Sequence, residues 1–392
     1  MSNSVEFLRN VAIVAHVDHG KTTLVDKLLR QSGTLDERGD REERVMDSGD
    51  IEKERGITIL AKNTAIGWTA PDGQDWRINI VDTPGHADFG GEVERVLSMV
   101  DSVVLLVDAV EGPMPQTSFV TKKALAQGLR PIVVVNKIDR VGARPDWVVD
   151  QTFDMFDRLG ATDEQLDFPV VFASALNGWA SDEADQEGTD MTPLFQAIVK
   201  NAPVPNVDPD APLQLQVSAL DYSTYTGVIG IGRVVRGTLS EKQNVVIAAP
   251  DGTERKGRIV DLYGFMGLDR VKMETVSAGD ICCFTGIDKL GISDMICDPE
   301  HVDMLPPLSV DEPTISMTFQ VNDSPFAGRE GKYVTSRNIK DRLDRELIHN
   351  VALRVEQLDD ADARLALTAL LVRIARADGC YDADEVAHIE RI

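Results

Sequence analysis

One short segment, Ala15-His-Val-Asp-His-Gly-Lys-Thr22, most constrains the fold of this chain. It follows an apolar run at residues 11–14 and precedes an amphipathic helical pattern. Such a turn binds phosphate, because the first backbone N–H groups of the helix face the ligand. Lys21 would neutralise phosphate charge, the Thr22 hydroxyl would bind Mg²⁺, and Ala15 replaces the first glycine of the motif, which is tolerable without a positive φ. The segment predicts an α/β phosphate-binding domain; for this motif alone, an ordinary strand, turn and helix is the alternative.

Apolar runs alternate with longer amphipathic stretches from Asn10 to about Ala202. This alternation is typical of a parallel sheet whose strands are joined by helices. Continuous apolar runs also suit strands that are covered on both faces. The expected strands are residues 11–14, 78–81, 103–107, 132–135 and 170–172.

The pattern changes after a proline-rich segment at residues 203–209, where we place a domain boundary. Short β-branched runs between glycine-rich turns, over residues 213–303, predict a small β-barrel. Residues 315–321 then alternate apolar and polar side chains as a half-buried strand does, and a helix stripe follows. A strand and a helix of this size need further strands beside them. We therefore expect a partial ferredoxin-like α+β unit in this part of the chain.

The last segment is rich in alanine and leucine, and its apolar side chains have helical spacing over residues 367–374. This spacing predicts a short helical tail. Four acidic side chains follow, and they either bind a metal ion through clustered oxygens or form a turn and a helix cap. They are Asp378, Asp382, Asp384 and Glu385.

The charge balance excludes one class of protein. The chain has 65 acidic and 40 basic side chains among 392 residues, a net charge of -25. A nonspecific nucleic-acid coat needs many basic residues, so we expect no DNA partner. The four cysteines, two of them adjacent at Cys282 and Cys283, are expected to be reduced. No apolar run approaches the roughly 20 residues of a membrane span, and residues 1–6 have no leader pattern, so we expect a cytoplasmic protein without a membrane partner.

Two more polar motifs suit a phosphate site. Asp82-Thr-Pro-Gly85-His86 directly follows a predicted strand, where Asp82 can hold Mg²⁺ through water and the N–H of Gly85 can approach a γ-phosphate. Taken alone, Asp82 can equally be a turn carboxylate. Thr58, in Arg55-Gly-Ile-Thr, offers a second hydroxyl to Mg²⁺, although a threonine that enters a strand explains this segment too.

Two segments select the base. Asp139, in Asn136-Lys-Ile-Asp, can accept hydrogen bonds from N1 and N2 of guanine, whereas adenine presents an unprotonated ring nitrogen there. A buried carboxylate left unpaired is a strong basis for rejecting adenine. Ser174, Ala175 and Leu176 follow the next strand and can add a backbone donor to the guanine oxygen. In this order, the motifs predict a guanine-nucleotide site.

Together these motifs resemble those of the translational GTPases, and more narrowly those of the BipA/TypA group of ribosome-associated GTPases. The wider family is matched by residues 16–22, 55–58, 82–86 and 136–139. The narrower group is matched by Ala-Pro-Asp-Gly at residues 70–73, Arg-Val-Gly-Ala-Arg-Pro at 140–145 and Asn-Asp-Ser-Pro-Phe-Ala-Gly at 322–328. The likeness covers about residues 5–360.

The resemblance implies a Mg²⁺-dependent GTPase that acts as a molecular switch between GTP and GDP, turns over slowly without the ribosome, and binds ribosomal RNA and protein. The implied nucleotide-binding residues are Asp18, His19, Gly20, Lys21, Thr22, Thr23, Asn136, Lys137, Asp139, Ser174, Ala175 and Leu176. The implied metal ligands are Thr22, Thr58 and Asp82. The implied catalytic residues are His86, which positions the attacking water, with Lys21, Asp18 and Gly85. Val17 and Ile57 would form a hydrophobic gate in front of His86, and Asp18 would also help to place a monovalent cation.

The chain departs from this family after Asp362, where the family continues with a Gly-Arg-Gly-Glu-Leu-His-Leu block and two more domains. The tail is instead similar to a truncated TerB-like tellurite-resistance domain. The expected fold class is multidomain α/β: a P-loop GTPase domain (1–205), a β-barrel (206–308), a partial ferredoxin-like unit (309–360) and a short helical tail (361–392). The alternative function is a truncated or chimeric protein that binds GTP and GDP without productive ribosome-stimulated turnover.

Overall fold

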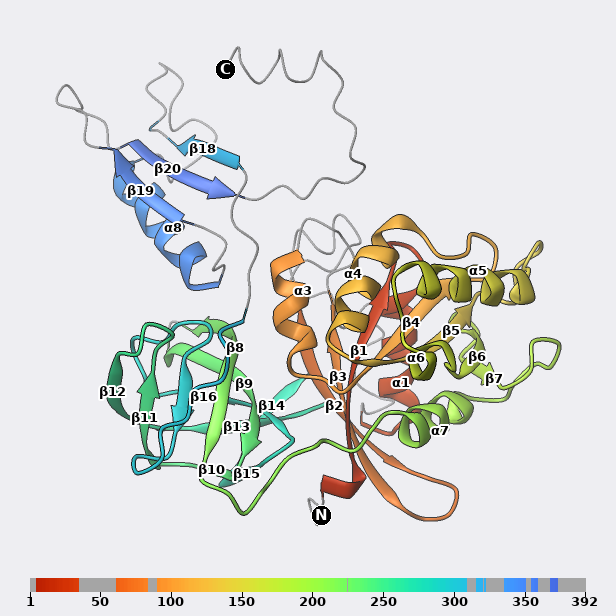
Figure 1. Cartoon of the computed structure of the whole chain (residues 1–392), viewed down its shortest axis with the longest axis horizontal. Coiled ribbons are helices and arrows are strands. Elements are labelled where there is room, and N and C mark those ends of the chain that lie inside the picture. The colour runs from red at the N-terminus through yellow and green to blue at the C-terminus, as the bar shows by residue number, and fades with distance from the viewer. Residues whose placement is uncertain are drawn as a thin grey trace.

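A sheet with helices on both faces forms from the N-terminal half of the chain (Figure 1). The computed structural model describes residues 5–34, 61–83, 90–223, 225–308, 315–319, 321, 335–349, 354–358 and 367–372. The strands of this sheet lie in the order β2-β3-β1-β4-β5-β6-β7. They are β1 (Leu8–Ala15), β2 (Lys62–Thr69), β3 (Asp75–Asp82), β4 (Ser102–Asp108), β5 (Arg130–Asn136), β6 (Val170–Ser174) and β7 (Trp179–Ser181). The five predicted strands are confirmed as a parallel set, and β2 and β7 add antiparallel edges.

The helices of this part bury both faces of the sheet. They are α1 (Lys21–Gln31), α3 (Gly90–Leu97), α4 (Pro115–Ala126), α5 (Pro145–Arg158), α6 (Asp163–Leu166) and α7 (Thr192–Asn201), after a short 3-10 helix at Val5–Phe7. Successive residues of a strand point to opposite faces. Val11 and Ile13 accordingly join the core under α1 and α7, whereas Ala12 and Val14 join the core under α3, α4 and α5. Burial on both faces explains why β1 is continuously apolar from Val11 to Ala15.

The expected β-barrel is confirmed. Its main sheet has the strand order β12-β11-β17-β8-β9-β16-β13-β14, and β10 pairs with β15. The strands are β8 (Gln214–Ser223), β9 (Gly227–Arg236), β10 (Thr238–Ser240), β11 (Asn244–Ala248), β12 (Glu254–Arg258), β13 (Leu262–Met266), β14 (Asp269–Lys272), β15 (Thr275–Ser277), β16 (Ile281–Phe284) and β17 (Met295–Cys297).

One face of the barrel shares a core with the first domain. Cys282 and Cys283 are buried free thiols on β16, and they point to opposite faces, as expected for strand neighbours. Cys282 packs inside the barrel, whereas Cys283 and Ile281 belong to the apolar cluster that includes α3 and α4. Burial raises the pKa of the Cys283 thiol to about 11, so this side chain stays a neutral, apolar packing group.

The third part of the chain contains a strand where the sequence predicts the beginning of a helical tail. Strand β18 (Ile315–Phe319) and helix α8 (Ser336–His349) are confirmed, with β19 (Arg354–Leu358) after them. The helical tail is wrong at Leu367–Val372, which form strand β20 between β18 and β19. The leucine spacing there suits a helix, but β20 pairs with both β18 and β19, and tertiary pairing overrides local preference. The rest of the expected tail, with its four acidic residues, lies outside the described residues.

A buried polar network joins the first sheet to the barrel. Asn79 Nδ2 donates to Asn10 Oδ1 (2.8 Å) and to Asp280 Oδ1 (2.8 Å). Asn10 Nδ2 donates to the Gly279 carbonyl (2.9 Å), and Arg77 Nε lies 3.1 Å from Asp280 Oδ2. These contacts lie toward the amino end of β1, opposite the edge from which the predicted phosphate loop emerges.

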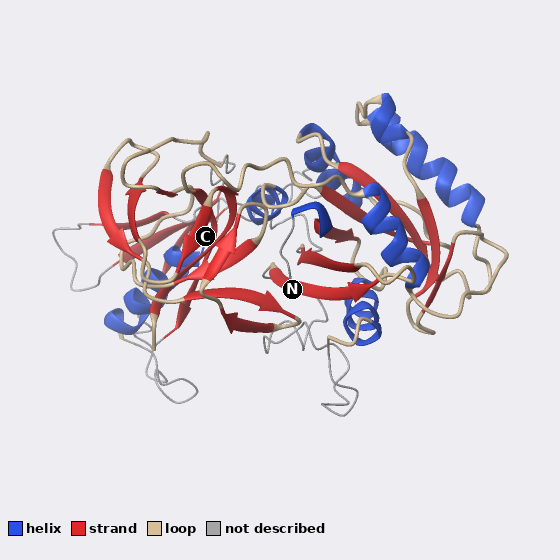
Figure 2. Cartoon of the chain, turned by 90° about the horizontal axis from the view of Figure 1, so that it is seen from below, coloured by secondary structure: helices blue, strands red, loops and turns tan. Residues whose placement is uncertain are grey.

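Further contacts extend this interface along the sheet edge, where Figure 2 shows the barrel strands beside the first sheet. The Gly267 N–H donates to the Ala65 carbonyl (2.8 Å), which joins β2 to the turn after β13. Arg233 Nη1 lies 2.9 Å from Asp101 Oδ1. The two parts are therefore held by main-chain, ionic and apolar contacts together.

Among the described helices, none is long and apolar enough to cross a membrane.

Replacing Asp280 by alanine removes the acceptor shared by Arg77 and Asn79 and leaves a guanidinium partly buried without its counter-charge. We expect the free energy of unfolding to fall by about 3 kcal/mol, because removing one partner of a buried ion pair leaves the other charge buried without compensation. Urea denaturation measures this loss. Asp269→Ala, at an exposed barrel carboxylate, is the control, and equal stabilities of the two variants would contradict the prediction.

Candidate nucleotide-binding site

Polar residues gather at one edge of the first sheet because four parallel strands, one on one side of β1 and three on the other, end there. Asp82, Asp108, Asn136 and Ser174 are the last residues of β3, β4, β5 and β6. The strand register sets Asp108 beside Asn136, and β1 ends at Ala15 on the same edge. Ligands of open α/β sheets bind at the carboxyl ends of the strands. The sheet therefore brings the sequence-predicted motifs of residues 15–22, 82–83, 136–139 and 174–176 together.

The phosphate loop leads into the N-terminus of α1, which no side chain caps. Gly20 is the N-cap of α1 with φ of 95°, a left-handed conformation that favours glycine. Ala15 lies within β1 and needs no positive φ, so its replacement of the usual glycine is tolerated as predicted. Asp18 has φ of 65°, which aspartate accepts more readily than most residues. An uncapped helix N-terminus of this kind attracts anions.

Asn136 holds the phosphate loop against the loop after β6. Its Nδ2 donates to the His19 carbonyl (2.8 Å), and its Oδ1 accepts the Ala175 N–H (2.9 Å). A Cβ at Gly20 would lie 2.6 Å from Asn136 Nδ2, a distance that side chains do not tolerate. The glycine is therefore required twice, by its backbone conformation and by this close contact.

Lys137 spans the same two motifs through its ammonium group. The residue has φ of 61°, an uncommon conformation for lysine. Its Nζ donates to the Asp18 carbonyl and lies 2.8 Å from Asp108 Oδ2. The phosphate loop and the segment expected to bind the base are thus joined by two consecutive side chains.

Lys21 and Asp82 form a buried ion pair. Lys21 Nζ lies 2.9 Å from Asp82 Oδ1, with side-chain exposures of 8% and 0%, and it also donates to the Thr83 carbonyl. Thr83 Oγ1 in turn donates to the Ile13 carbonyl (2.7 Å), which fixes this segment to β1. The lysine expected to bind phosphate and the carboxylate expected to bind Mg²⁺ are therefore each other's partners here.

Two titratable groups are shifted by this environment. Burial opposes ionisation of Asp108, but the hydrogen bonds from Lys137 and from the Val110 N–H outweigh it and hold the pKa of this carboxyl below its ordinary value. Burial lowers the pKa of the His19 imidazole, so this side chain is neutral at pH 7. The phosphate side of the site therefore gains no positive charge from His19.

The remaining predicted residues have distinct surroundings. Asp139 is exposed, as a carboxylate that must meet a ligand has to be, and Leu176 is 74% exposed, whereas Ser174 is buried. Thr22 and Thr23 lie half-buried in the first turn of α1, and Val17 is half-buried in the phosphate loop. Thr58, Ile57, Gly85 and His86 lie outside the described residues.

The described residues fit a nucleotide with Mg²⁺. The candidate metal ligands are oxygen atoms, those of the Thr22 hydroxyl and the Asp82 carboxylate, and they lie at or beside the N-terminus of α1. Mg²⁺ is commonly bound by one or two protein oxygens together with substrate phosphates. Within the described part of the chain, no cluster of three or more His, Cys, Asp or Glu side chains forms a self-sufficient metal site.

Sequence reasoning missed Asp108 and the loop that it begins. The residue has no place in the motifs, yet it carries the same signal as Asp82 and Asn136: a polar residue directly after a continuous apolar strand. That position alone was enough to put Asp108 at the ligand-binding edge.

Comparisons with known proteins agree with this geometry. The family model of the elongation factor Tu GTP binding domain matches residues 6–204, and that of elongation factor Tu domain 2 matches residues 227–297. The large ribosomal subunit assembly factor BipA of Escherichia coli (strain K12) is 64% identical over 359 residues, which are 92% of this chain and 58% of that protein. The proteins of the same name from Haemophilus influenzae and Buchnera aphidicola are 64% identical over 365 residues and 57% identical over 355 residues, with 92% and 91% of this chain covered and 58% and 57% of those proteins.

A solved structure shares the fold. A crystal structure of a protein from Thermus thermophilus aligns with a TM-score of 0.67 over 94% of this chain and 64% of that chain, at 19% identity. The chain thus spans somewhat more than half the length of the curated relatives it matches. These matches confirm the resemblance to the BipA/TypA group and the expected combination of a nucleotide-binding domain with a barrel.

Replacing Gly20 by alanine tests the close contact with Asn136. The left-handed backbone and the clash together are expected to lower the free energy of unfolding by about 1–3 kcal/mol. Gly33→Ala is the matched control, because Gly33 also has a positive φ but a Cβ there meets nothing within 4 Å. Chemical denaturation of both variants separates backbone strain from the clash, and equal losses would show that Asn136 does not restrict this position.

Proposed function

Because the chain belongs to the family of the elongation factor Tu GTP binding domain, the translational GTPases, we propose that it binds GTP and GDP and hydrolyses GTP as a molecular switch. The observation that carries this proposal is the double hydrogen bond of Asn136, which fixes the phosphate loop beside the loop after β6. In that arrangement the nucleotide would lie between the N-terminus of α1 and the exposed carboxylate of Asp139.

Base selection is assigned to Asp139 and the residues after β6. The Asp139 carboxylate would accept hydrogen bonds from N1 and N2 of guanine, and adenine would leave it unsatisfied. Ala175 already uses its N–H on Asn136, so the backbone donor to the guanine oxygen would come from its neighbour Leu176. The side chain of Lys137 joins the segment that carries Asp139 to the phosphate loop, because it donates to the Asp18 carbonyl.

Phosphate and metal binding would require Lys21 and Asp82 to change partners. The ammonium of Lys21 would turn from Asp82 to the phosphates, while Thr22, Asp82 and, by resemblance, Thr58 would hold Mg²⁺. Bound Mg²⁺ supplies positive charge that neutralises the phosphate oxygens. A monovalent cation near Asp18 belongs to the same proposal.

Hydrolysis is assigned by resemblance to His86, which would position the attacking water, with the Gly85 N–H near the γ-phosphate. Val17 and Ile57 would keep His86 away until the partner binds. Positioning and charge stabilisation account for most of the catalysis in phosphoryl transfer. A gate over the positioning residue therefore makes turnover slow in the isolated protein.

The ribosome is the proposed partner, because the relatives in three organisms are named as large ribosomal subunit assembly factors. A ribosomal partner also makes the cytoplasm the proposed location. We propose the domain division at residues 205 and 308 as well, and β20 moves the end of the third part from residue 360 to at least Val372. The second candidate function is a GTP- and GDP-binding protein without ribosome-stimulated turnover.

Asp139→Asn tests base selection. The substituted amide presents N–H groups where guanine also donates, so we expect GDP affinity to fall at least about 100-fold, with the preference over ADP lost. Titration calorimetry with each diphosphate and Mg²⁺ measures both changes. Asp150→Asn, at an exposed position on α5, is the control. A wild-type protein that binds ADP as tightly as GDP would contradict the proposal.

Ribosome-stimulated turnover separates the two candidate functions. We expect slow GTP hydrolysis by the protein alone, a rise on addition of ribosomes, and a drop of about 100-fold or more in the stimulated rate for His86→Ala. Phosphate release measures the rates, and co-sedimentation with a non-hydrolysable GTP analogue or GDP measures ribosome binding. Tight nucleotide binding without any stimulation would favour the second candidate.

A further inference from the structure

A loop outside the recognised motifs adjoins both halves of the nucleotide site. Residues 108–114, here called the β4 loop, join β4 to α4. Strand β4 lies between β1 and β5, so a loop at its carboxyl end has the phosphate loop on one side and residues 137–144 on the other. The β4 loop is therefore placed to contact both.

Asp108 begins this loop with a side chain that is 0% exposed. Its Oδ1 accepts the N–H groups of Val110 (2.7 Å) and Glu111 (3.3 Å), which shapes the turn. Its Oδ2 lies 2.8 Å from Lys137 Nζ and 3.5 Å from Arg140 Nη1. The two oxygens thus have separate roles: one folds the β4 loop, and the other holds the cations of the neighbouring loop.

The Lys137 ammonium links Asp108 to the phosphate loop. It donates to the Asp18 carbonyl as well as to Asp108, so it is held between a buried charge and the main chain of the phosphate loop. Charge-assisted hydrogen bonds of this kind are about twice as strong as neutral ones. They oppose the steric cost of the left-handed backbone at Lys137.

Main-chain contacts fix the β4 loop independently of that charge. The Ala109 N–H donates to the Asn136 carbonyl (2.8 Å), and the Arg144 N–H donates to the Ala109 carbonyl (2.8 Å). Arg144 Nη2 also donates to the Val110 carbonyl (2.9 Å), and its guanidinium lies 3.9 Å from the centre of the Trp147 ring. A change that removes only the charge of Asp108 therefore leaves the loop attached.

The opposite side of the β4 loop touches the phosphate loop directly. His19 Nε2 lies 3.5 Å from Glu111 Oε2 of this loop, and His19 Nδ1 lies 3.4 Å from the carbonyl of Leu106 in strand β4. The β4 loop consequently adjoins the phosphate loop on one side and, on the other, residues 137–144, here called the base-selecting loop.

We propose that Asp108 is a positioning residue for guanine-nucleotide binding, whose buried carboxylate fixes the Lys137 ammonium and so sets the base-selecting loop against the phosphate loop. This inference rests on the proposed function and extends it to a residue outside the four motifs. Asp108 does not touch the nucleotide; it acts through Lys137.

Asp108→Asn isolates the charge, because the asparagine oxygen can still accept the N–H groups of Val110 and Glu111 while its amide no longer attracts Lys137. We expect GDP affinity to fall about tenfold, the equivalent of one hydrogen bond to a charged group. Titration calorimetry of the full chain with GDP and Mg²⁺ measures the affinity, and thermal unfolding measures stability. Asp294→Asn is the matched control: Asp294 is a buried barrel carboxylate that also accepts a backbone N–H, from Gly291 (2.9 Å), and a cation, Arg255 (2.8 Å). It should lose stability without losing affinity.

A double-substitution cycle with Lys137→Met distinguishes positioning from general destabilisation. If Asp108 acts through Lys137, the double variant Asp108→Asn with Lys137→Met binds GDP as weakly as Lys137→Met alone. Independent, multiplying losses would overturn the inference, as would wild-type affinity in Asp108→Asn. Should Asp108→Asn unfold because its ammonium partner is left buried, the double variant, which lacks that ammonium, allows the same comparison with Lys137→Met. Failure of the wild-type chain to bind GDP would instead contradict the proposed function itself.

Discussion

The carboxamide of Asn136 is the contact on which the candidate site depends, because one side chain sets two loops at a fixed separation. Its nitrogen binds the phosphate loop at His19, and its oxygen binds the loop after β6 at Ala175. The requirement for glycine at position 20 follows from the same contact, since any side chain there would displace the carboxamide. A shift at either loop is thus transmitted to the other through a rigid planar group. At the proposed site, this coupling would let the two ends of a nucleotide be recognised together.

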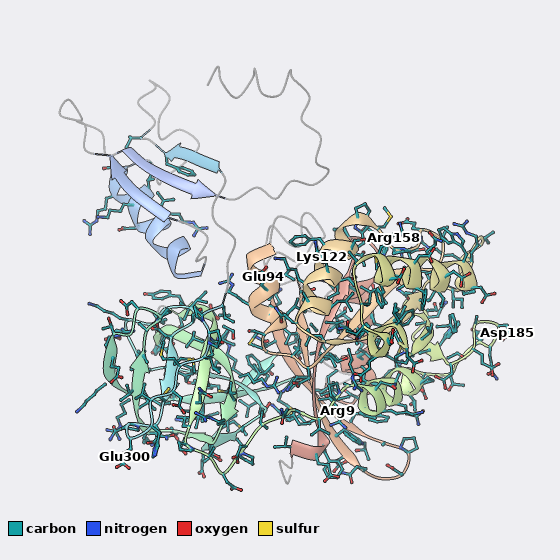
Figure 3. The ribbon with its side chains drawn as sticks, in the orientation of Figure 1. Arg9, Glu94, Lys122, Arg158, Asp185 and Glu300 are labelled. Atoms are coloured by element: carbon teal, nitrogen blue, oxygen red, sulfur yellow. The ribbon has the colours of Figure 1, made fainter. Side chains whose placement is uncertain are left out.

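The opposite edge of the sheet supplies the rigid base for these loops. Asn10, Asn79 and Asp280 join the amino ends of the central strands to the barrel, and the outward face of β16 packs in the same apolar core as α3 and α4. Glu94 on α3, labelled in Figure 3, is ion-paired with Lys123 of α4. Helix α3, which follows the Asp82-Thr-Pro-Gly-His segment in the sequence, therefore packs against both α4 and the barrel.

The sequence allowed the strand ends to be predicted because a polar residue after a continuous apolar run marks the carboxyl edge of a parallel sheet. Asp82 and Asn136 were found in this way, and Asp108 has the same signal but was missed because it belongs to no known motif. The strand at Leu367–Val372 was mistaken for a helix, because its leucine spacing suits a helix and one of its two partner strands, β18, lies before α8 in the sequence. The network around Asn79 had no sequence signal, because an isolated polar residue in an apolar strand does not reveal its partner on another domain.

The ion pair between Lys21 and Asp82 bears on how such a site can be loaded. Both charges are buried, so removing either partner without replacement would leave an uncompensated charge in a poorly solvated place. An anion at Lys21 and a cation at Asp82 satisfy both charges at once, whereas either ion alone satisfies only one. At the proposed site, the pair would therefore favour simultaneous entry of phosphate and metal over stepwise entry.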